Sequence, residues 1–170
     1  MKTILERYTE LISELKDTIY RVAVNLLGDS AEAEDVTQDI YERVWRARDA
    51  VLDQSSPKAY VCRMTHNLAV DRLRHKGWQS ENIRPTIMAS DGNRTTELND
   101  LTTLAHQAIA TLPEKQRLII HLRDVEGYEF DEIAQIVGSD EASVRVNLSR
   151  ARKAVREQLL KAMNHGVERD

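Results

Sequence analysis

The stretch from Tyr128 to Arg156 limits the possible folds of this chain more than any other. Its first half has apolar side chains at the i, i+3, i+4, i+7 spacing of a short amphipathic helix. These are Phe130, Ile133, Ala134 and Val137. Gly138 follows, and glycine is typical of the position just past a helix end. Ser139 or Asp140 can then cap a second helix, with an apolar stripe at Val144, Leu148, Ala151, Val155 and Leu159. Two helices joined by a tight glycine-containing turn predict a helix-turn-helix.

The predicted second helix also has a face that a hydrophobic core does not need. At about 100° per residue this face lies away from the apolar stripe, and it consists of Arg145, Val146, Ser149, Arg150 and Lys153. In the major groove of DNA, arginine can bond guanine edges bidentately, serine can serve either base type, and valine can touch a thymine methyl. The face could instead be a solvated helix surface. Its place behind a cap and a helix-turn-helix spacing favours DNA recognition.

The composition suits an all-helical soluble protein. Of the 170 residues, 31% are charged and 5% aromatic, with 6 Gly and 3 Pro. No run approaches the ~20 apolar residues of a membrane span, and the N-terminus turns charged too soon for a signal peptide. Because Cys62 is the one cysteine, no internal disulfide can form, and a reducing cytoplasm is the expected location.

The charge of the chain is segregated along its length. The net charge of −4 argues against a general nucleic-acid coat. Between Gly28 and Glu42, however, there are acidic residues and no Lys or Arg. Basic residues outnumber acidic ones from Lys58 to Lys76 and from Arg145 to Arg156. This pattern is typical of a protein that holds both a basic partner and a polyanion.

Three helices are predicted in the first part of the chain. The first runs from about Ile4 to Leu27; the second starts after Asp29, with Glu32 in a capping-box arrangement. The third runs from Pro57, at the first helical position, to about His75. Their expected buried residues are Leu11, Leu15, Ile19, Val22 and Leu26; Ala33, Val36, Ile40, Val44, Ala47 and Val51; and Tyr60, Val61, Met64, Leu68 and Leu73. Tyr41 and Trp45 lie beside the second stripe and either widen the core contact or touch a partner.

The pattern changes between residues 79 and 99, which are rich in polar and turn-forming residues and predict a flexible linker. A second domain is expected to open at Asp100, as a cap, with a first stripe at Leu101, Leu104, Ala105, Ala108 and Leu112. Pro113 starts the next helix, with Leu118, Ile119 and Leu122 facing in. The predicted fold is all-α: two small helical domains, residues 1–78 and 100–170, joined by the linker, the C-terminal one a helix-turn-helix.

Three segments in this order resemble the sigma-70 family of bacterial RNA polymerase sigma factors. Residues 34–41 (EDVTQDIY) resemble the acidic helix that holds the polymerase clamp helices, and residues 60–74 resemble the promoter-melting helix. Residues 112–117 (LPEKQR), with the helix-turn-helix behind them, resemble the last domain. Two domains and a linker with nothing else match the small extracytoplasmic-function (ECF) subgroup. Tyr60 stands where the family usually has Trp, and it keeps the aromatic bulk.

The resemblance implies a function and a set of partners. The chain would bind the RNA polymerase core, through the β′ clamp helices and the β flap, and direct promoter-specific initiation, including promoter melting. It would be no enzyme, with no catalytic residues, no cofactor, no metal and no small-molecule substrate. Promoter DNA and an anti-sigma factor are the other implied partners. The implied location is the cytoplasm, at the nucleoid with polymerase or at the inner membrane with an anti-sigma factor.

The resemblance also assigns three sets of site residues. The minus-thirty-five element would be bound by Arg145 and Arg150 at base edges, Val146 and Ser149 in secondary contacts, and Ser143 and Lys153 at phosphates. The minus-ten element would be bound by Arg63, Asn67, Asp71, Arg72 and Arg74, with the loop Asp53–Ser56 as a candidate pocket wall. Polymerase would be bound by Glu34, Asp35, Gln38, Asp39 and Tyr41. Asn67 and Asp71, one turn apart, could instead form a structural hydrogen bond inside the domain, and the acidic face could be merely solvated.

Three other functions compete with this interpretation. A helix-turn-helix regulator of the response-regulator output type would leave the first domain without a task. An enzyme is disfavoured because there is no Walker-type phosphate loop and no His-Glu-x-x-His motif. Cys62 also lacks a CxxC partner, so a zinc site is not expected. A helical adaptor that binds only protein would leave the basic second helix unexplained.

Overall fold

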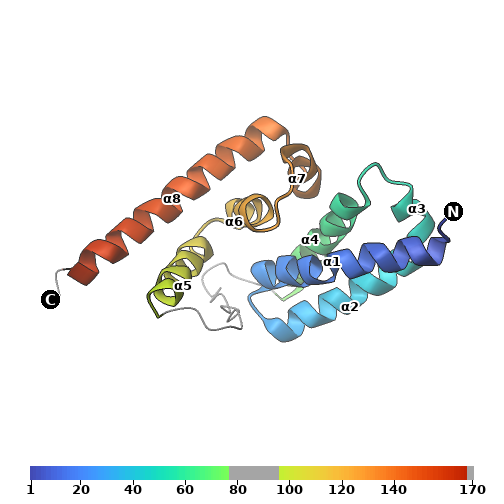
Figure 1. Ribbon diagram of the computed structural model, residues 1–170, viewed down its shortest axis with the longest axis horizontal. Helices are drawn as coiled ribbons and strands as arrows, with labels where there is room; N and C mark the ends of the chain where they lie inside the picture. Colours follow the sequence, from blue (N-terminus) through green and yellow to red (C-terminus); the bar gives the residue numbers. More distant parts are fainter. Residues whose placement is uncertain (77–95, 168–170) are drawn as a thin grey trace.

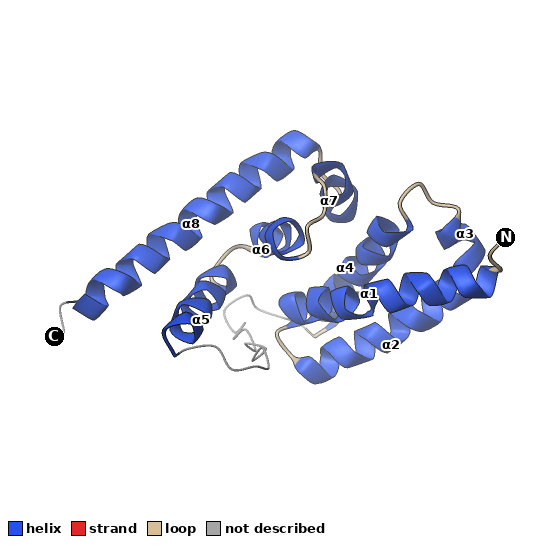
Figure 2. Ribbon diagram, viewed as in Figure 1, coloured by secondary structure: helices blue, strands red, loops and turns tan. Residues whose placement is uncertain are grey.

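The computed structural model describes residues 1–76 and 96–167, and the regular structure within them is helical throughout (Figures 1 and 2). The first domain contains α1 (Ile4–Leu27), α2 (Ser30–Arg46), α3 (Arg48–Leu52) and α4 (Pro57–His75). The second contains α5 (Thr96–Ala110), α6 (Glu114–Ile120), the π-helix η2 (His121–Val125), α7 (Phe130–Val137) and α8 (Glu141–Val167). The prediction of an all-α fold is confirmed. Residues 79–95 of the predicted linker lie outside the described residues.

Local capping determines where the helices of the first domain begin and end. Gly28 ends α1 in the left-handed conformation, with φ 67°, which glycine adopts without strain. Asp29 caps α2, since its Oδ1 accepts a hydrogen bond from the backbone N–H of Glu32 at 2.9 Å. The predicted capping box is only half formed, because the Glu32 carboxylate pairs with Lys76 Nζ at 2.5 Å instead. Ser56 caps α4 through the N–H of Ala59.

The core of the first domain lies between α1, α2 and α4, and most of the predicted stripe residues are buried there. Ala47 and Tyr60 are the exceptions. Ala47 is exposed because the predicted second helix breaks there into α2 and α3. Tyr60 is 37% exposed because the buried side of α4 is centred on Val61, Thr65 and Leu68, which turns Tyr60 outward. Its neighbour Met64 is partly buried.

The second domain begins earlier than predicted. Helix α5 starts at Thr96, so Asp100 lies within the helix and does not cap it. Leu101 is 45% exposed, whereas Ala108 and Leu112 near the other end are buried where α5 meets α8. Pro113 precedes α6 directly, and Leu118, Ile119 and Leu122 are buried as predicted.

The helix-turn-helix forms as predicted from α7 and the start of α8. Gly138 ends α7 with φ 66°, in the left-handed region. Asp140 is the cap of α8, because its Oδ1 accepts a hydrogen bond from the N–H of Ser143 at 2.6 Å. Ser139, the other candidate cap, accepts a hydrogen bond from Lys115 on α6. This contact ties the turn to the rest of the second domain.

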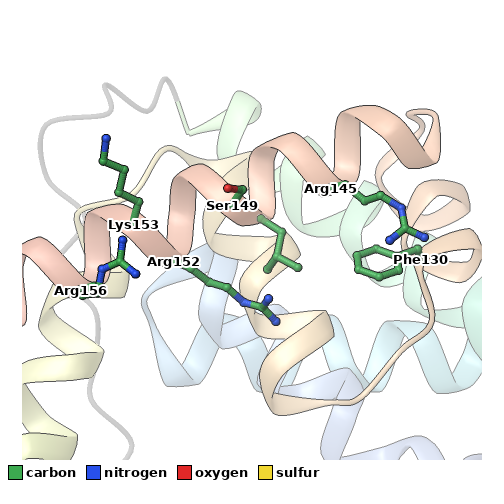
Figure 3. A pocket seen from close by; sticks show the side chains of 7 residues that line it. Phe130, Arg145, Ser149, Arg152, Lys153 and Arg156 are labelled. Carbon is green, nitrogen blue, oxygen red and sulfur yellow. The ribbon is translucent and has the colours of Figure 1, made fainter.

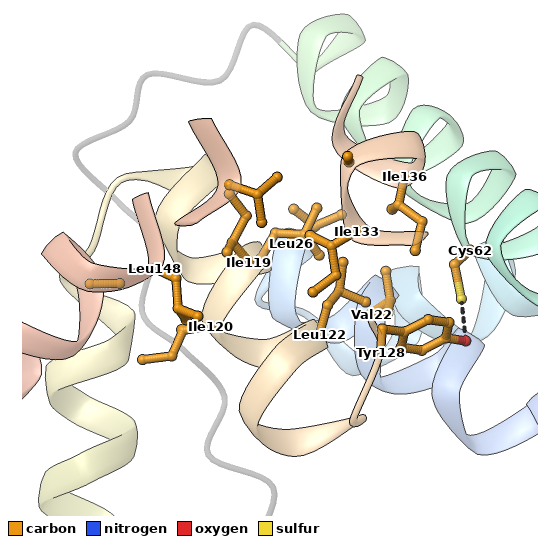
Figure 4. Packing of buried hydrophobic residues seen from close by; sticks show 14 of the residues in the cluster. Val22, Leu26, Cys62, Ile119, Ile120, Leu122, Tyr128, Ile133, Ile136 and Leu148 are labelled. Atoms are coloured by element: carbon orange, nitrogen blue, oxygen red, sulfur yellow. Dashed lines mark hydrogen bonds between the residues drawn. The ribbon is translucent and has the colours of Figure 1, made fainter. Parts of the chain in front are cut away.

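The two domains share one hydrophobic core, which no sequence pattern had predicted (Figure 4). Val22 and Leu26 of α1 and Ala59, Cys62 and Ala69 of α4 pack in the same cluster as apolar residues of α6, η2, α7 and α8. At one edge of the cluster, Cys62 Sγ and the Tyr128 hydroxyl are hydrogen-bonded at 3.1 Å. Helix α4 is therefore buried on two sides, against α1 and against α7.

A buried carboxylate also joins the two domains. Glu126, which follows η2, has a side chain that is 5% exposed. It accepts hydrogen bonds from Arg21 Nε at 2.6 Å and from the Thr18 hydroxyl at 2.9 Å, both on α1, and His121 Nε2 lies 3.2 Å away. Burial alone would raise the pKa of Glu126, but the hydrogen bonds from Arg21 and Thr18, together with the nearby His121 ring, outweigh it. The pKa of Glu126 is therefore held well below its ordinary value.

Glu126→Gln is expected to destabilise the folded chain at pH 7 by about 1–3 kcal/mol, because Arg21 loses a charged acceptor in a buried site. Because the pKa of Glu126 is lowered by folding, its carboxylate contributes fully to the free energy of unfolding above the unfolded-state pKa of about 4.3. As the pH falls below that value, this contribution becomes progressively smaller. Chemical denaturation of both proteins between pH 7 and pH 3 measures the difference, which should shrink in acid. Glu10→Gln, in an exposed pair with Lys2, is the matched control; a difference independent of pH would contradict the assignment.

Candidate nucleic-acid interface

The predicted reading face lies along the first half of α8. Arg145, Val146, Ser149, Arg150 and Lys153 are exposed, and Ser143 is half-buried. The opposite side of the helix is buried at Val144, Leu148 and Ala151. Arg150 has no hydrogen bond or ion pair to any described residue, so its guanidinium is available to a ligand.

Arg145 is exposed but not free. Its guanidinium carbon lies 3.9 Å from the ring centroid of Phe130, the first residue of α7. Its Nη2 also lies 3.8 Å from Glu141, one turn earlier on α8. A second guanidinium, that of Arg123, lies over the same Phe130 ring at 4.6 Å. The sequence pattern had assigned Phe130 only to the apolar stripe of the first helix, where it is partly buried.

A shallow basic groove follows one side of α8 (Figure 3). Its volume is about 450 Å³, and it is lined by Phe130, Arg145, Leu148, Ser149, Arg152, Lys153 and Arg156. Sequence reasoning had not placed Arg152 and Arg156 in the site. Their i+7 and i+11 spacing from Arg145 was the signal that could have found them, since it puts all three on one side of a helix. Arg152 is paired with Asp124 of η2, its Nε lying 3.0 Å from the carboxylate.

The predicted minus-ten residues lie on α4, and four of the five are exposed: Arg63, Asn67, Asp71 and Arg74. Asn67 and Asp71 each have a polar partner inside the first domain. Asn67 Oδ1 lies 3.3 Å from His66 Nδ1, and Asp71 lies 3.9 Å from Arg74. Arg63 has no hydrogen bond or ion pair to any described residue. The exposed strip of α4 is thus open to a ligand.

Arg72, the fifth residue of that set, points toward α2. Its Nη2 donates a hydrogen bond to Asp39 Oδ2 at 2.5 Å, and its Nη1 lies 3.8 Å from Glu32 and 3.9 Å from Asp35. The stretch that carries the acidic face of α2 contains no Lys or Arg of its own. The end of α4 supplies two, because Lys76 also pairs with Glu32.

The predicted polymerase-binding residues all lie on α2. Glu34, Asp35 and Gln38 are exposed, while Asp39 is engaged by Arg72. Tyr41 is partly buried, and its carbonyl accepts a hydrogen bond from the Tyr8 hydroxyl at 3.3 Å.

Trp45, which the sequence placed beside the core, is 41% exposed. It contacts Tyr8 edge to face, with the ring centroids 5.0 Å apart, and Arg48 lies over its ring at 4.6 Å. In the loop Asp53–Ser56, the first three residues are exposed, and the Ser56 hydroxyl donates to Glu132 of α7 at 3.2 Å.

No group of three or more His, Cys, Asp or Glu side chains that could hold a metal ion is present among the residues described. Within the same part of the chain, no helix has the length and apolar content needed to cross a membrane.

Comparison with protein families matches both domains. The model for sigma-70 region 2 matches residues 11–79, and the model for sigma-70 region 4 matches residues 103–155. Together the two matches span more than half of the chain. The chain therefore belongs to the sigma-70 family, in its ECF subgroup. Sigma factors are transcription initiation factors and not enzymes.

Individual proteins that this chain resembles are also sigma factors. The chain is 29% identical over 160 residues to the ECF RNA polymerase sigma factor SigE of Mycolicibacterium smegmatis, covering 91% of this chain and 62% of SigE. It is 25% identical over 170 residues to the ECF sigma factor SigW of Bacillus subtilis, covering 91% of this chain and 89% of SigW. Among solved structures, the sigma factor RpoE of Bartonella quintana, in complex with the anti-sigma factor NepR, has a TM-score of 0.73 at 21% identity. That match covers 91% of this chain and 97% of RpoE and supports the fold.

The Arg72–Asp39 pair is expected to couple by about 1 kcal/mol in a double-mutant cycle of unfolding free energies, because its short contact is partly shielded from water. The control is the Arg74–Asp71 pair on the same helix, whose atoms lie 3.9 Å apart and are far more exposed. Its coupling should be close to zero. Equal coupling energies for the two pairs would show that the Arg72–Asp39 contact stabilises the fold no more than an exposed ion pair does.

Proposed function

We propose that this chain binds the RNA polymerase core and directs it to specific promoters, where it also stabilises the melted DNA. The observation that carries the proposal is that both functional regions of the sigma-70 family occur in family order with their candidate contact faces exposed. These faces are the acidic side of α2, the outer strip of α4 and the reading face of α8. The chain spans 62% of the length of SigE.

The upstream promoter element is assigned to α8. Arg145 and Arg150 are assigned to base edges, and Val146 and Ser149 to secondary contacts in the major groove. Ser143 and Lys153 are assigned to phosphates, which position the helix without reading sequence. The groove beside α8 adds Arg152 and Arg156 to the positive surface available to the DNA backbone.

The downstream element is assigned to the exposed strip of α4. Arg63 and Arg74 provide positive charge for the backbone of an extruded strand, and Asn67 and Asp71 provide polar contacts to bases. Arg72 fits a different role, because its guanidinium is engaged by α2. Holding bases outside the stack needs no hydrolysis, since binding of the open strand offsets the few kcal/mol per base of unstacking.

Polymerase is assigned to two surfaces. Glu34, Asp35 and Gln38 on α2 form an exposed acidic face that suits basic residues of the β′ clamp helices. On the second domain, a groove of about 390 Å³ beside the C-terminal half of α8, lined by residues including Ile120, Val155 and Leu159, provides an apolar surface suited to the β flap.

An anti-sigma factor is proposed as a further partner. RpoE of Bartonella quintana, whose fold this chain shares, was solved in complex with the anti-sigma factor NepR. With these partners, the proposed location is the cytoplasm, at the nucleoid when the chain is bound to polymerase, or at the inner membrane when an anti-sigma factor holds it there.

The direct test is reconstituted transcription with the host's core polymerase and a pool of random promoters, read by sequencing of the transcripts. The chain should enrich promoters that share an upstream and a downstream element. Core enzyme alone is the control, and the same background initiation with and without the chain would refute the proposal.

Arg150→Ala is expected to weaken promoter selection mainly at one upstream base position, by ~1–3 kcal/mol. The reason is that Arg150 is exposed on the reading face and has no ion pair to any described residue. The randomised promoter pool measures this as lost preference at that position. A uniform loss at every position would show that Arg150 contacts only phosphate.

Asp35→Lys is expected to abolish association with core polymerase while leaving the fold intact, because it reverses the charge at an exposed point of the acidic face. Pull-down with purified core enzyme measures association, and circular dichroism measures folding. Asp49→Lys, at an exposed acid of α3 outside that face, is the matched control. Undiminished binding by Asp35→Lys would remove the acidic face from the interface.

A further inference from the structure

We infer that Phe130 is a positioning residue for promoter recognition: its ring holds the Arg145 guanidinium in place to read a guanine of the upstream element. The inference rests on the proposed function and deepens its assignment of α8. It adds a residue outside the reading helix to the determinants of sequence preference.

The geometry sets Phe130 beside Arg145 across the turn of the helix-turn-helix (Figure 3). The ring belongs to the first residue of α7, and the arginine lies on the second turn of α8. The guanidinium carbon of Arg145 is 3.9 Å from the ring centroid, within the range of a favourable cation–π contact. Both side chains line the basic groove along α8.

A guanidinium that stacks by its face keeps its edge free. The N–H donors of arginine lie in the plane of the group, so stacking on an aromatic ring leaves them able to form a bidentate pair. Guanine presents two acceptors, O6 and N7, at the spacing that this pair requires. The Phe130 contact therefore restricts the position of Arg145 without using the atoms that would read the base.

Without the ring, Arg145 has a competing partner. Glu141 lies one turn earlier on α8, with its carboxylate 3.8 Å from Arg145 Nη2. Ion pairs at this spacing are favourable on a helix, and a closer pairing would occupy the donors needed for guanine. In the stacked conformer the ion pair with Glu141 is long and includes no hydrogen bond. The ring thus opposes a closer pairing of Arg145 with Glu141.

Phe130 is itself held in place. It is partly buried and packs against the hydrophobic core that the two domains share. The Phe130 ring also contacts Arg123, whose guanidinium carbon lies 4.6 Å from the ring centroid. Arg123 is anchored in turn, because its Nη1 donates hydrogen bonds to the Tyr128 carbonyl at 2.7 Å and to Glu129 at 3.2 Å. The ring is therefore a fixed support rather than a mobile side chain.

The test compares four variants as holoenzymes on a promoter pool randomised in the upstream element. Phe130→Leu removes the aromatic face but keeps apolar volume, Phe130→Trp keeps and enlarges it, and Arg145→Ala removes the reader. The fourth is the double variant Phe130→Leu/Arg145→Ala. Thermal unfolding of each chain by circular dichroism establishes that it is folded.

The base that loses preference in Arg145→Ala is expected to be guanine. Phe130→Leu should lower the preference for that same guanine about two- to fivefold, as expected from a cation–π contact of ~0.5–1 kcal/mol. Phe130→Trp should retain it. The double variant should be no less selective at that position than Arg145→Ala alone, because the ring acts only through the arginine.

Two results would overturn the inference. One is a uniform drop in transcription for Phe130→Leu with unchanged base preference, which would reveal a purely structural role. The other is an equal loss in Phe130→Leu with and without Arg145. A wild-type chain that selects no upstream element at all would instead refute the proposed function, which this inference presupposes.

Discussion

Helix α4 is buried on two sides, and the arrangement of the whole molecule depends on this. Val61 and Leu68 pack into the core of the first domain, while Ala59, Cys62 and Ala69 belong to the core shared with the second domain. The second set consists of small side chains, which allow α7 to approach closely. The strip that remains exposed carries the candidate DNA contacts. The same helix therefore joins the domains and presents a functional face.

Several acidic and basic side chains of this chain form ion pairs with each other inside the molecule. The basic end of α4 neutralises part of the acidic face of α2 through Arg72 and Lys76. Arg21 of α1 meets the buried Glu126 of the second domain. These pairs distinguish charges with a structural task from charges left for ligands. Glu34 on α2, Arg63 on α4 and Arg150 on α8 are exposed and have no ion pair to any described residue, and they are the stronger candidates for contact with polymerase or DNA.

Predictions from the sequence were accurate where the physics is local. The bounds of α4 follow from the Ser56 cap, Pro57 and the helical pattern, and Gly28 and Gly138 end helices because they adopt positive φ. Errors arose where packing competes with a local preference. Glu32 has the spacing of a capping box but pairs with Lys76 instead. Tyr60 is apolar enough for the core but faces outward, since the helix buries a neighbouring side.

The sequence by itself determined the helices, the helix-turn-helix and the charged faces, since each depends on residues a few positions apart. It also carried the motifs that identify the family. Only the tertiary structure decided which charges are neutralised, that the two domains share a core, and that Phe130 supports Arg145. The partners Asp39 and Arg72 are 33 residues apart, and Arg21 and Glu126 are 105 apart. Such pairs form because separate hydrophobic faces pack together, and no periodicity along one helix encodes which faces will meet.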